Sequence, residues 1–100
     1  MNALEYGLDM PEIPKSQELI KPLLRVLNSR GVLSNAEIRQ DIERLLELSD
    51  EARNLIHSGS RSELEYRLAW ARTNAKSKGL IESPKREHWQ ITELGKTRVQ

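Results

Sequence analysis

The chain has 100 residues, of which 37% are hydrophobic and 31% charged, with a formal net charge of +1. These values fit one small globular domain with a thin core, and a core without Phe must be largely aliphatic. The absence of cysteine excludes disulfides and thiolate zinc sites. No apolar run is long enough for a membrane span and the N-terminus carries no signal-peptide pattern, so we expect a cytoplasmic protein with no membrane partner.

The N-terminal stretch, residues 1–14, has two prolines and no periodic apolar pattern, which predicts a flexible arm. Ser16 can cap the helix that follows, where apolar residues recur at helical spacing. Pro22 lies several residues into this helix. Either the first turn is separate and the main helix begins near Lys21, or the helix bends at the proline. Gly31 can end it in a left-handed conformation.

The middle of the chain predicts a short strand and two helices. Val32 and Leu33 form an apolar pair that can pair with a later hairpin. Ser34 opens an S-x-x-E capping box, which indicates a helix with an apolar face formed by Ile38, Ile42, Leu45 and Leu46. Ser49 then caps a shorter helix, whose inward residues are expected to be Ala52, Leu55 and Ile56. Residues 58–60 read as a loop.

A longer helix follows, and Ser60 and Ser62 offer two registers for its cap, because each precedes a glutamate by three residues. At 100° per residue, one face holds Leu64, Leu68, Ala71 and Ala75. The opposite face holds Tyr66, Trp70, Thr73 and Ser77.

A hairpin is predicted after Gly79, with strands at residues 80–83 and 88–91 and a turn between them, and Ile81, Trp89 and Ile91 could point inward. Thr92 can cap a final helical turn. The order of elements is therefore helix, short strand, helix, short helix, helix, hairpin and helical tail. This order predicts a mainly α fold with a small β-hairpin, arranged as a winged helix-turn-helix over residues 15–98.

Positive charge gathers in the long helix and the hairpin. Residues 61–90 hold seven Lys or Arg and four Glu, a net charge of about +3, whereas residues 37–53 hold six acidic and three basic residues. A basic helix followed by a basic hairpin is typical of a winged helix that binds nucleic acid, although a solvated helix face and a charged β-turn can look the same. We expect contacts to double-stranded DNA from Arg61, Arg67, Arg72, Thr73, Asn74, Lys76, Ser77, Lys85 and Arg86.

Two of these residues, Arg61 and Arg72, are expected to contact phosphates. Trp70 lies off the apolar centre of the long helix. An outward indole could stack on a base, but packing against the short helix or the wing is the preferred expectation, because a Trp left in water is rare.

Catalytic chemistry has little support in the sequence. His57 and His88 are the only histidines, and neither has Cys, Asp or Glu residues at ligand spacing. The glycines are scattered, so no phosphate-binding loop is present, and the serines lie mainly at caps and loops. We therefore expect no catalytic residues, no metal site, no cofactor and no enzyme activity from this chain.

The sequence resembles the N-terminal domain of Mrr-type restriction endonucleases, the type IV enzymes that act on modified DNA. The resemblance covers about residues 13–98 and is carried by KPLLRVL, SNAEIRQDI, YRLAWARTNAKSKGLIESPKREHWQIT and ELGK. Pro22 belongs to it, because the family has a proline before the paired leucines. Ala75 departs from the pattern, which usually has a larger apolar residue, and suggests a looser core contact there.

The resemblance implies a winged-helix DNA-binding domain that, in the parent protein, is covalently linked to a nuclease domain. It implies methylated DNA as a candidate target without identifying the modified base. A different class of function stays open, in which the winged helix is a protein-interaction or dimerisation module, and a homodimer is compatible with either.

Overall fold

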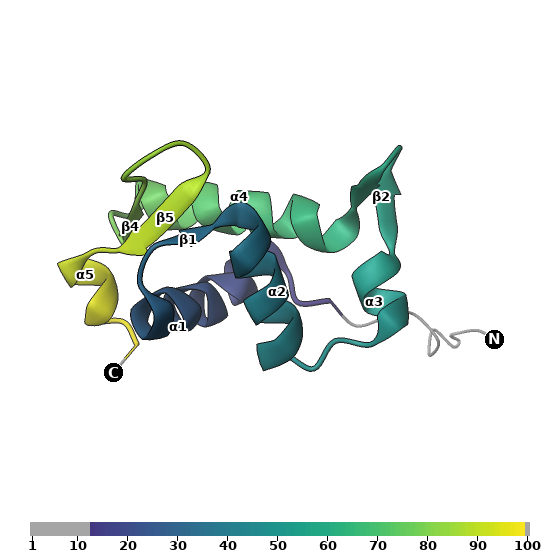
Figure 1. Ribbon diagram of the computed structural model, residues 1–100, viewed down its shortest axis with the longest axis horizontal. Coiled ribbons are helices and arrows are strands. Elements are labelled where there is room, and N and C mark those ends of the chain that lie inside the picture. Colours follow the sequence, from purple (N-terminus) through teal and green to yellow (C-terminus); the bar gives the residue numbers. More distant parts are fainter. Residues whose placement is uncertain (1–12, 100) are drawn as a thin grey trace.

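The computed structural model describes residues 13–99 as a mainly helical domain with two small antiparallel sheets (Figure 1). Its elements in chain order are η1 (Ser16–Leu19), α1 (Ile20–Arg30), β1 (Leu33–Ser34), α2 (Asn35–Leu45), α3 (Asp50–Asn54), β2 (Ile56–Ser58), β3 (Arg61–Ser62), α4 (Glu63–Ser77), β4 (Ile81–Glu82), β5 (His88–Ile91) and α5 (Glu93–Lys96). The mainly α fold with a β-hairpin is confirmed, and the arrangement is consistent with a winged helix-turn-helix.

The start of the domain explains how Pro22 fits into a helix. The first turn is a separate 3-10 turn, η1, and α1 begins at Ile20, so Pro22 lies in the first turn of α1. Backbone N–H groups in a first turn have no partner within their own helix, so proline removes no bond there. The expected cap at Ser16 is wrong, because Ser16 is already inside η1. Most of the predicted arm, residues 1–12, lies outside the described residues.

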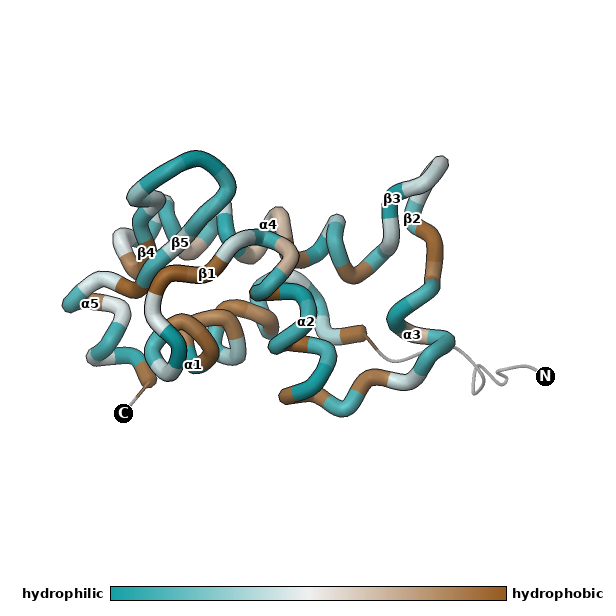
Figure 2. The backbone as a smooth tube through the Cα atoms, in the orientation of Figure 1, coloured by the Kyte–Doolittle hydropathy of each residue, from teal (hydrophilic) through white to brown (hydrophobic). Residues whose placement is uncertain are grey.

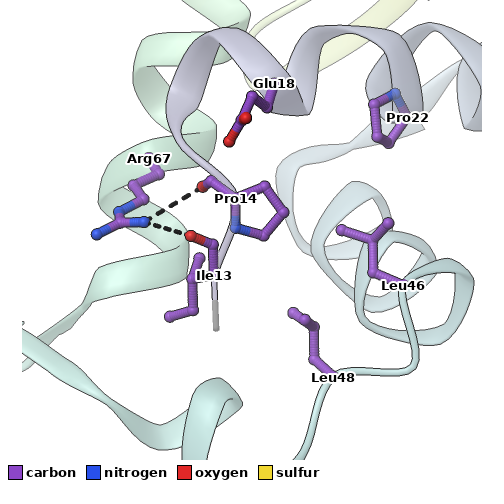
Figure 3. Close-up of a pocket in the computed structure, with 7 residues that line it drawn as sticks. All are labelled: Ile13, Pro14, Glu18, Pro22, Leu46, Leu48 and Arg67. Atoms are coloured by element: carbon purple, nitrogen blue, oxygen red, sulfur yellow. Dashed lines mark hydrogen bonds between the residues drawn. The ribbon is translucent and has the colours of Figure 1, made fainter. Parts of the chain in front are cut away.

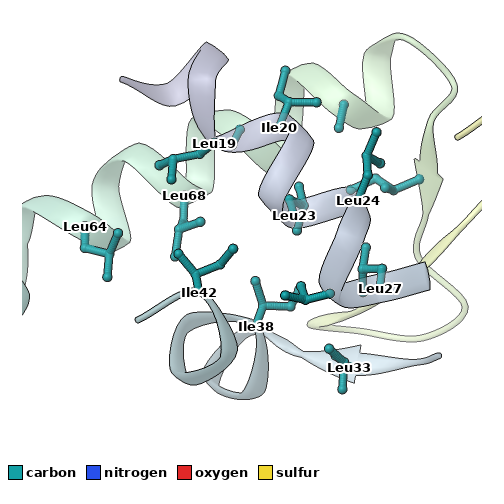
Figure 4. Close-up of a cluster of buried hydrophobic side chains, with 14 of the residues drawn as sticks. Leu19, Ile20, Leu23, Leu24, Leu27, Leu33, Ile38, Ile42, Leu64 and Leu68 are labelled. Carbon is teal, nitrogen blue, oxygen red and sulfur yellow. The ribbon is translucent and has the colours of Figure 1, made fainter. Parts of the chain in front are cut away.

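The hydrophobic core lies where α1, α2 and α4 meet (Figure 4). Leu23 and Leu27 of α1 are almost completely buried, as are Ile38 and Ile42 of α2. Leu45, expected on the same face, is 46% exposed at the end of α2, so that expectation is wrong. Hydrophobic residues colour much of α1 and β1, whereas the loop between β4 and β5 is hydrophilic (Figure 2).

Four helices begin at a hydroxyl cap. Ser34 accepts from the N–H of Glu37, and the same capping box returns a bond from the Ser34 N–H to the Glu37 side chain, at 2.8 Å. Ser62, and not Ser60, caps α4. Equivalent bonds at Ser49 and Thr92 start α3 and α5. Each side-chain oxygen satisfies an N–H that the helix itself leaves unpaired.

The sheet that forms the wing has the strand order β1-β5-β4. Leu33 of β1 pairs with Trp89 of β5, and Ile81 of β4 pairs with Ile91. The expected pairing of the short strand with the hairpin is confirmed, shifted by one residue toward Ser34. The wing therefore packs beside α1 and α2 and is anchored along both edges of β5.

A second hairpin, β2-β3, lies between α3 and α4 and was not predicted from the sequence. It pairs Ile56 with Ser62 and turns at Gly59, whose φ of 54° is left-handed. Ile56, expected to point inward, is 56% exposed, so that expectation is wrong. The hairpin rises at the N-terminal end of α4, at the opposite end of that helix from the wing (Figure 1). None of the helices in the described part of the chain is long and apolar enough to cross a membrane.

Candidate nucleic-acid interface

The inward face of α4 agrees with the sequence. Leu64, Leu68, Ala71 and Ala75 are all completely buried. Ala75 is fully buried, and the looser core contact expected there stays a prediction. The opposite face is open to solvent and contains Trp70, Thr73 and Ser77, and Lys76 is exposed on the flank beside it. These four exposed residues are together called here the outward face of α4.

Trp70 corrects a second expectation. Its side chain is 49% exposed on the outward face, where packing against a neighbouring element had been preferred. The position follows from helical geometry, since Trp70 is two residues from Leu68 and so about 200° around the helix from a buried residue. No element described in the structure buries that side of α4.

The wing tip is a compact basic turn. Lys85 and Arg86 are exposed there, and Glu87 takes a positive φ of 59°. The Ser83 hydroxyl donates to the Lys85 carbonyl at 2.7 Å, and the His88 Nδ1 lies 2.8 Å from the Arg86 carbonyl. These local bonds fix the backbone that presents the two cationic side chains.

The wing, α4 and the start of α2 meet at Trp89. Its indole Nε1 donates to the Asn35 Oδ1 at 2.8 Å, and the Lys76 Nζ lies 5.9 Å from the centre of the indole ring. The Asn35 N–H also donates to the Glu87 carbonyl at 3.0 Å. Lys76 of α4 therefore lies beside β5, the central strand of the wing. The contribution of Asn35 was missed, because its partner Trp89 lies 54 positions away in the chain and no local pattern links the two.

At the other end of α4, aromatic and basic groups gather around Tyr66. The His57 ring stacks on the Tyr66 ring with centroids 3.8 Å apart, and the Arg61 guanidinium lies 5.6 Å from the Tyr66 ring centre. A shallow hollow of about 370 Å³ opens next to them on the outward face of α4, lined by Arg61, Tyr66, Ala69, Trp70 and Thr73. The role of His57 depends on the β2-β3 hairpin, which no pattern in the sequence indicated.

Arg67 does not belong to the outward face. It lies on a flank of α4, where its Nε contacts Glu63 and its Nη1 donates to the carbonyls of Ile13 and Pro14 (Figure 3). The bonds from Arg67 and then from His57 hold the pKa of the Glu63 carboxyl below its usual value. The guanidinium of Arg67 is thus used to fix the segment that leads into η1.

Arg72 is also withdrawn from the surface. It is only 8% exposed, and its Nη1 has no hydrogen-bond partner among the described residues. Burial lowers the pKa of this guanidinium, and the nearby Glu65 carboxylate opposes that shift. Of the residues expected to contact DNA, six are exposed: Arg61, Thr73, Lys76, Ser77, Lys85 and Arg86. Asn74 is half-buried on a flank of α4, Arg67 is bonded to the segment before η1, and Arg72 is buried.

A capped helix followed by a longer helix and a hairpin with a basic turn is an arrangement consistent with a winged-helix domain. Residues 17–100 match the family model of the Mrr N-terminal domain, and the chain belongs to this family, which is part of Mrr-type restriction proteins. Comparisons with curated proteins and with solved structures returned no match. The chain holds this N-terminal domain and no nuclease domain. Within residues 13–99, no group of three or more His, Asp or Glu side chains could hold a metal ion.

Proposed function

We propose that this domain binds double-stranded DNA, with α4 in the major groove and the wing against the neighbouring phosphate backbone. The observation that carries the proposal is the position of Lys76, whose Nζ lies 5.9 Å from the centre of the Trp89 ring, so that a cation of α4 lies beside the central strand of the wing. Arginine and lysine side chains contact phosphates, and their release of counterions makes binding weaken steeply with salt.

Within this proposal, the residues divide by position. Arg61 lies in β3, directly before α4, Lys76 lies near the end of α4, and Lys85 and Arg86 lie at the wing tip. All four are exposed, so they are assigned to phosphates. Thr73 and Ser77 occupy the outward face and Asn74 its edge, and these three can form hydrogen bonds with base edges. Arg67 and Arg72 are left out, because their guanidinium groups are engaged or buried.

The wider context is part of the same proposal. The domain would direct a nuclease domain of the parent protein to its target in the cytoplasm, and methylated DNA is the target class that this role favours. The fragment alone would bind DNA without cutting it. Comparison of a methylated with an unmethylated duplex of the same sequence tests the preference for modified DNA.

A salt titration of binding to a short duplex tests the proposal, with Lys76→Ala and the pair Lys85→Ala with Arg86→Ala measured alongside. Each lost phosphate contact should reduce the slope of log K against log salt by about 0.9. Arg25→Ala is the matched control, since Arg25 is an exposed cation of α1, away from the outward face of α4. Binding that is absent at low salt, or equally reduced by the control, would refute the proposal.

A second function has one observation in its favour, namely the half-exposed Trp70, which a protein partner could cover. In that case the domain would be a protein-interaction or dimerisation module. Sedimentation of the domain across a range of concentrations separates the two functions. A stable dimer whose formation protects Trp70 from a fluorescence quencher would favour this alternative over DNA.

A further inference from the structure

Trp70 is the largest side chain on the outward face of α4, and the structure leaves it 49% exposed. Ala69 and Thr73, which line the same hollow, are smaller than the indole, and Tyr66 lies one turn before it. Leaving an indole in water is unfavourable, because it keeps a large apolar area hydrated. A bound partner that covers Trp70 would recover this area.

The charges around Trp70 indicate what kind of partner fits. Arg61 lines the same hollow, and Lys76 lies on the same helix toward the wing. A protein partner with an apolar contact surface would have to remove water from these cations without compensation, which is costly. A polyanion compensates both cations while it covers the indole, so charge complementarity favours nucleic acid.

Base edges in the major groove present mainly hydrogen-bonding groups, and the apolar exception is the methyl group at C5 of a pyrimidine. We infer that Trp70 is a specificity-determining residue whose indole contacts the C5-methyl group of thymine or of 5-methylcytosine. The inference rests on the proposed function and names one feature of the target. It requires no extrahelical base, because the C5-methyl group projects into the groove of an intact duplex.

The hollow beside Trp70 is held in shape by its far wall. The Tyr66 ring is stacked on the His57 ring and lies near the Arg61 guanidinium, and these two contacts restrict its movement across the hollow. Ala69 and Thr73 add little bulk to the floor. A methyl group and the edge of its base can therefore approach the indole from the open side.

The test begins by selecting tightly bound sequences from a pool of short duplexes with a randomised centre. The selected duplex is then resynthesised in four forms, with thymine or uracil and with cytosine or 5-methylcytosine, and the affinity of the domain for each is measured at fixed salt. Uracil differs from thymine only by the C5-methyl group, so the two substitutions separate the two sources of the same chemical group. Position-by-position replacement locates the contact.

For the wild-type domain we expect about a fourfold loss when the contacted methyl group is removed, or a similar gain when it is added to cytosine. Trp70→Ala should bind the four forms equally, and Trp70→Phe should keep the discrimination because it keeps an apolar ring. Leu45→Ala is the control, since Leu45 is 46% exposed but lines a separate hollow between α1 and α2.

Equal affinity of the wild-type domain for all four forms would overturn the inference and leave the proposed function intact. Discrimination that survives in Trp70→Ala would also overturn it, because the methyl group would then be read elsewhere. A failure to select any bound duplex at low salt would overturn the proposed function itself. Circular dichroism of each variant, compared with the wild-type spectrum, verifies that the fold is retained.

Discussion

The indole Nε1 of Trp89 donates a hydrogen bond to the side-chain oxygen of Asn35 across 2.8 Å, and these residues are 54 positions apart in the chain. The bond joins the central strand of the wing to the first residue of α2. It is supported by the backbone bond from the Asn35 N–H to the Glu87 carbonyl at 3.0 Å. The wing tip is therefore placed by α2 as well as by its own hairpin.

Asn35→Ala removes the acceptor and leaves the partly buried Trp89 N–H without this partner. We expect the free energy of unfolding to fall by about 1 kcal/mol. DNA affinity should also fall, because Lys85 and Arg86 would be less firmly placed. Urea unfolding and duplex binding measure the two effects. Asn28→Ala, at an exposed position of α1, is the control, and an equal loss in that variant would contradict the role of the bond.

Arg72→Met tests the buried guanidinium. Arg72 is 8% exposed with an unbonded Nη1, and an apolar side chain of similar length avoids burying this charge. We expect the free energy of unfolding to stay the same or to rise by about 1–2 kcal/mol, as when poorly compensated buried ions are replaced.

The same variant should leave the salt slope of DNA binding unchanged. A slope reduced by about one contact would mean that Arg72 reaches a phosphate in the complex, as the sequence suggested.

Gly95→Ala should be among the most damaging single changes in the domain. A Cβ at this position would lie 2.1 Å from the Leu80 carbonyl oxygen and 2.7 Å from the Ile91 Cγ1, and both neighbours belong to the packed base of the wing. We expect a loss of about 3 kcal/mol in the free energy of unfolding. Gly31→Ala is a useful comparison, because a Cβ there meets nothing within 4 Å. Alanine would be strained only by the positive φ of 88°, so the free energy of unfolding should fall by about 1 kcal/mol.

The Glu63 carboxyl gives the domain a dependence on acid pH. Its pKa is lowered by Arg67 and His57 in the folded state, so its contribution to stability is complete above the ordinary glutamate pKa of about 4.3. This contribution is lost as the pH falls through the lowered folded pKa. Glu63→Gln should therefore destabilise the domain at neutral pH and differ less from wild type in acid.

Urea unfolding over a series of pH values checks this expectation. Glu47→Gln, at an exposed site after α2, is the matched control and should follow the wild-type profile. A difference between Glu63→Gln and wild type that stays constant into acid would show that the carboxylate charge is not the cause.

Much of the fold could be predicted because local signals and burial agree along the chain. The caps at Ser34, Ser49 and Ser62 and the spacing of Leu64 and Leu68 depend only on near neighbours, and the structure confirms them. The β2-β3 hairpin was missed because its strands have only three and two residues, too few for an alternation of apolar and polar residues. Ile56 was placed inward for the same reason, as an apolar residue at apparent helical spacing.

The candidate site was harder to predict than the fold. In the sequence, Arg67, Arg72 and Lys76 are equally basic residues of one helix. The helical angle places Arg72 on a flank but does not show whether that flank is buried. Whether a flank is open depends on what packs against it. Arg67 is bonded to the segment at Ile13, and Arg72 is buried, which lowers its pKa. Trp70 shows the converse, since the preference for burying an indole cannot act where no neighbouring element covers the helix.

The central position of β5 has a consequence for the thermodynamics of binding. If β5 were paired with one strand only, the wing would be more mobile in the free domain, and ordering it on binding would cost conformational entropy. Here β5 is hydrogen-bonded to β4 on one side and to β1 on the other, and Trp89 is bonded to α2. The wing is therefore preorganised, and association should proceed with little change in backbone order, which amide hydrogen exchange in the free and bound domain would measure.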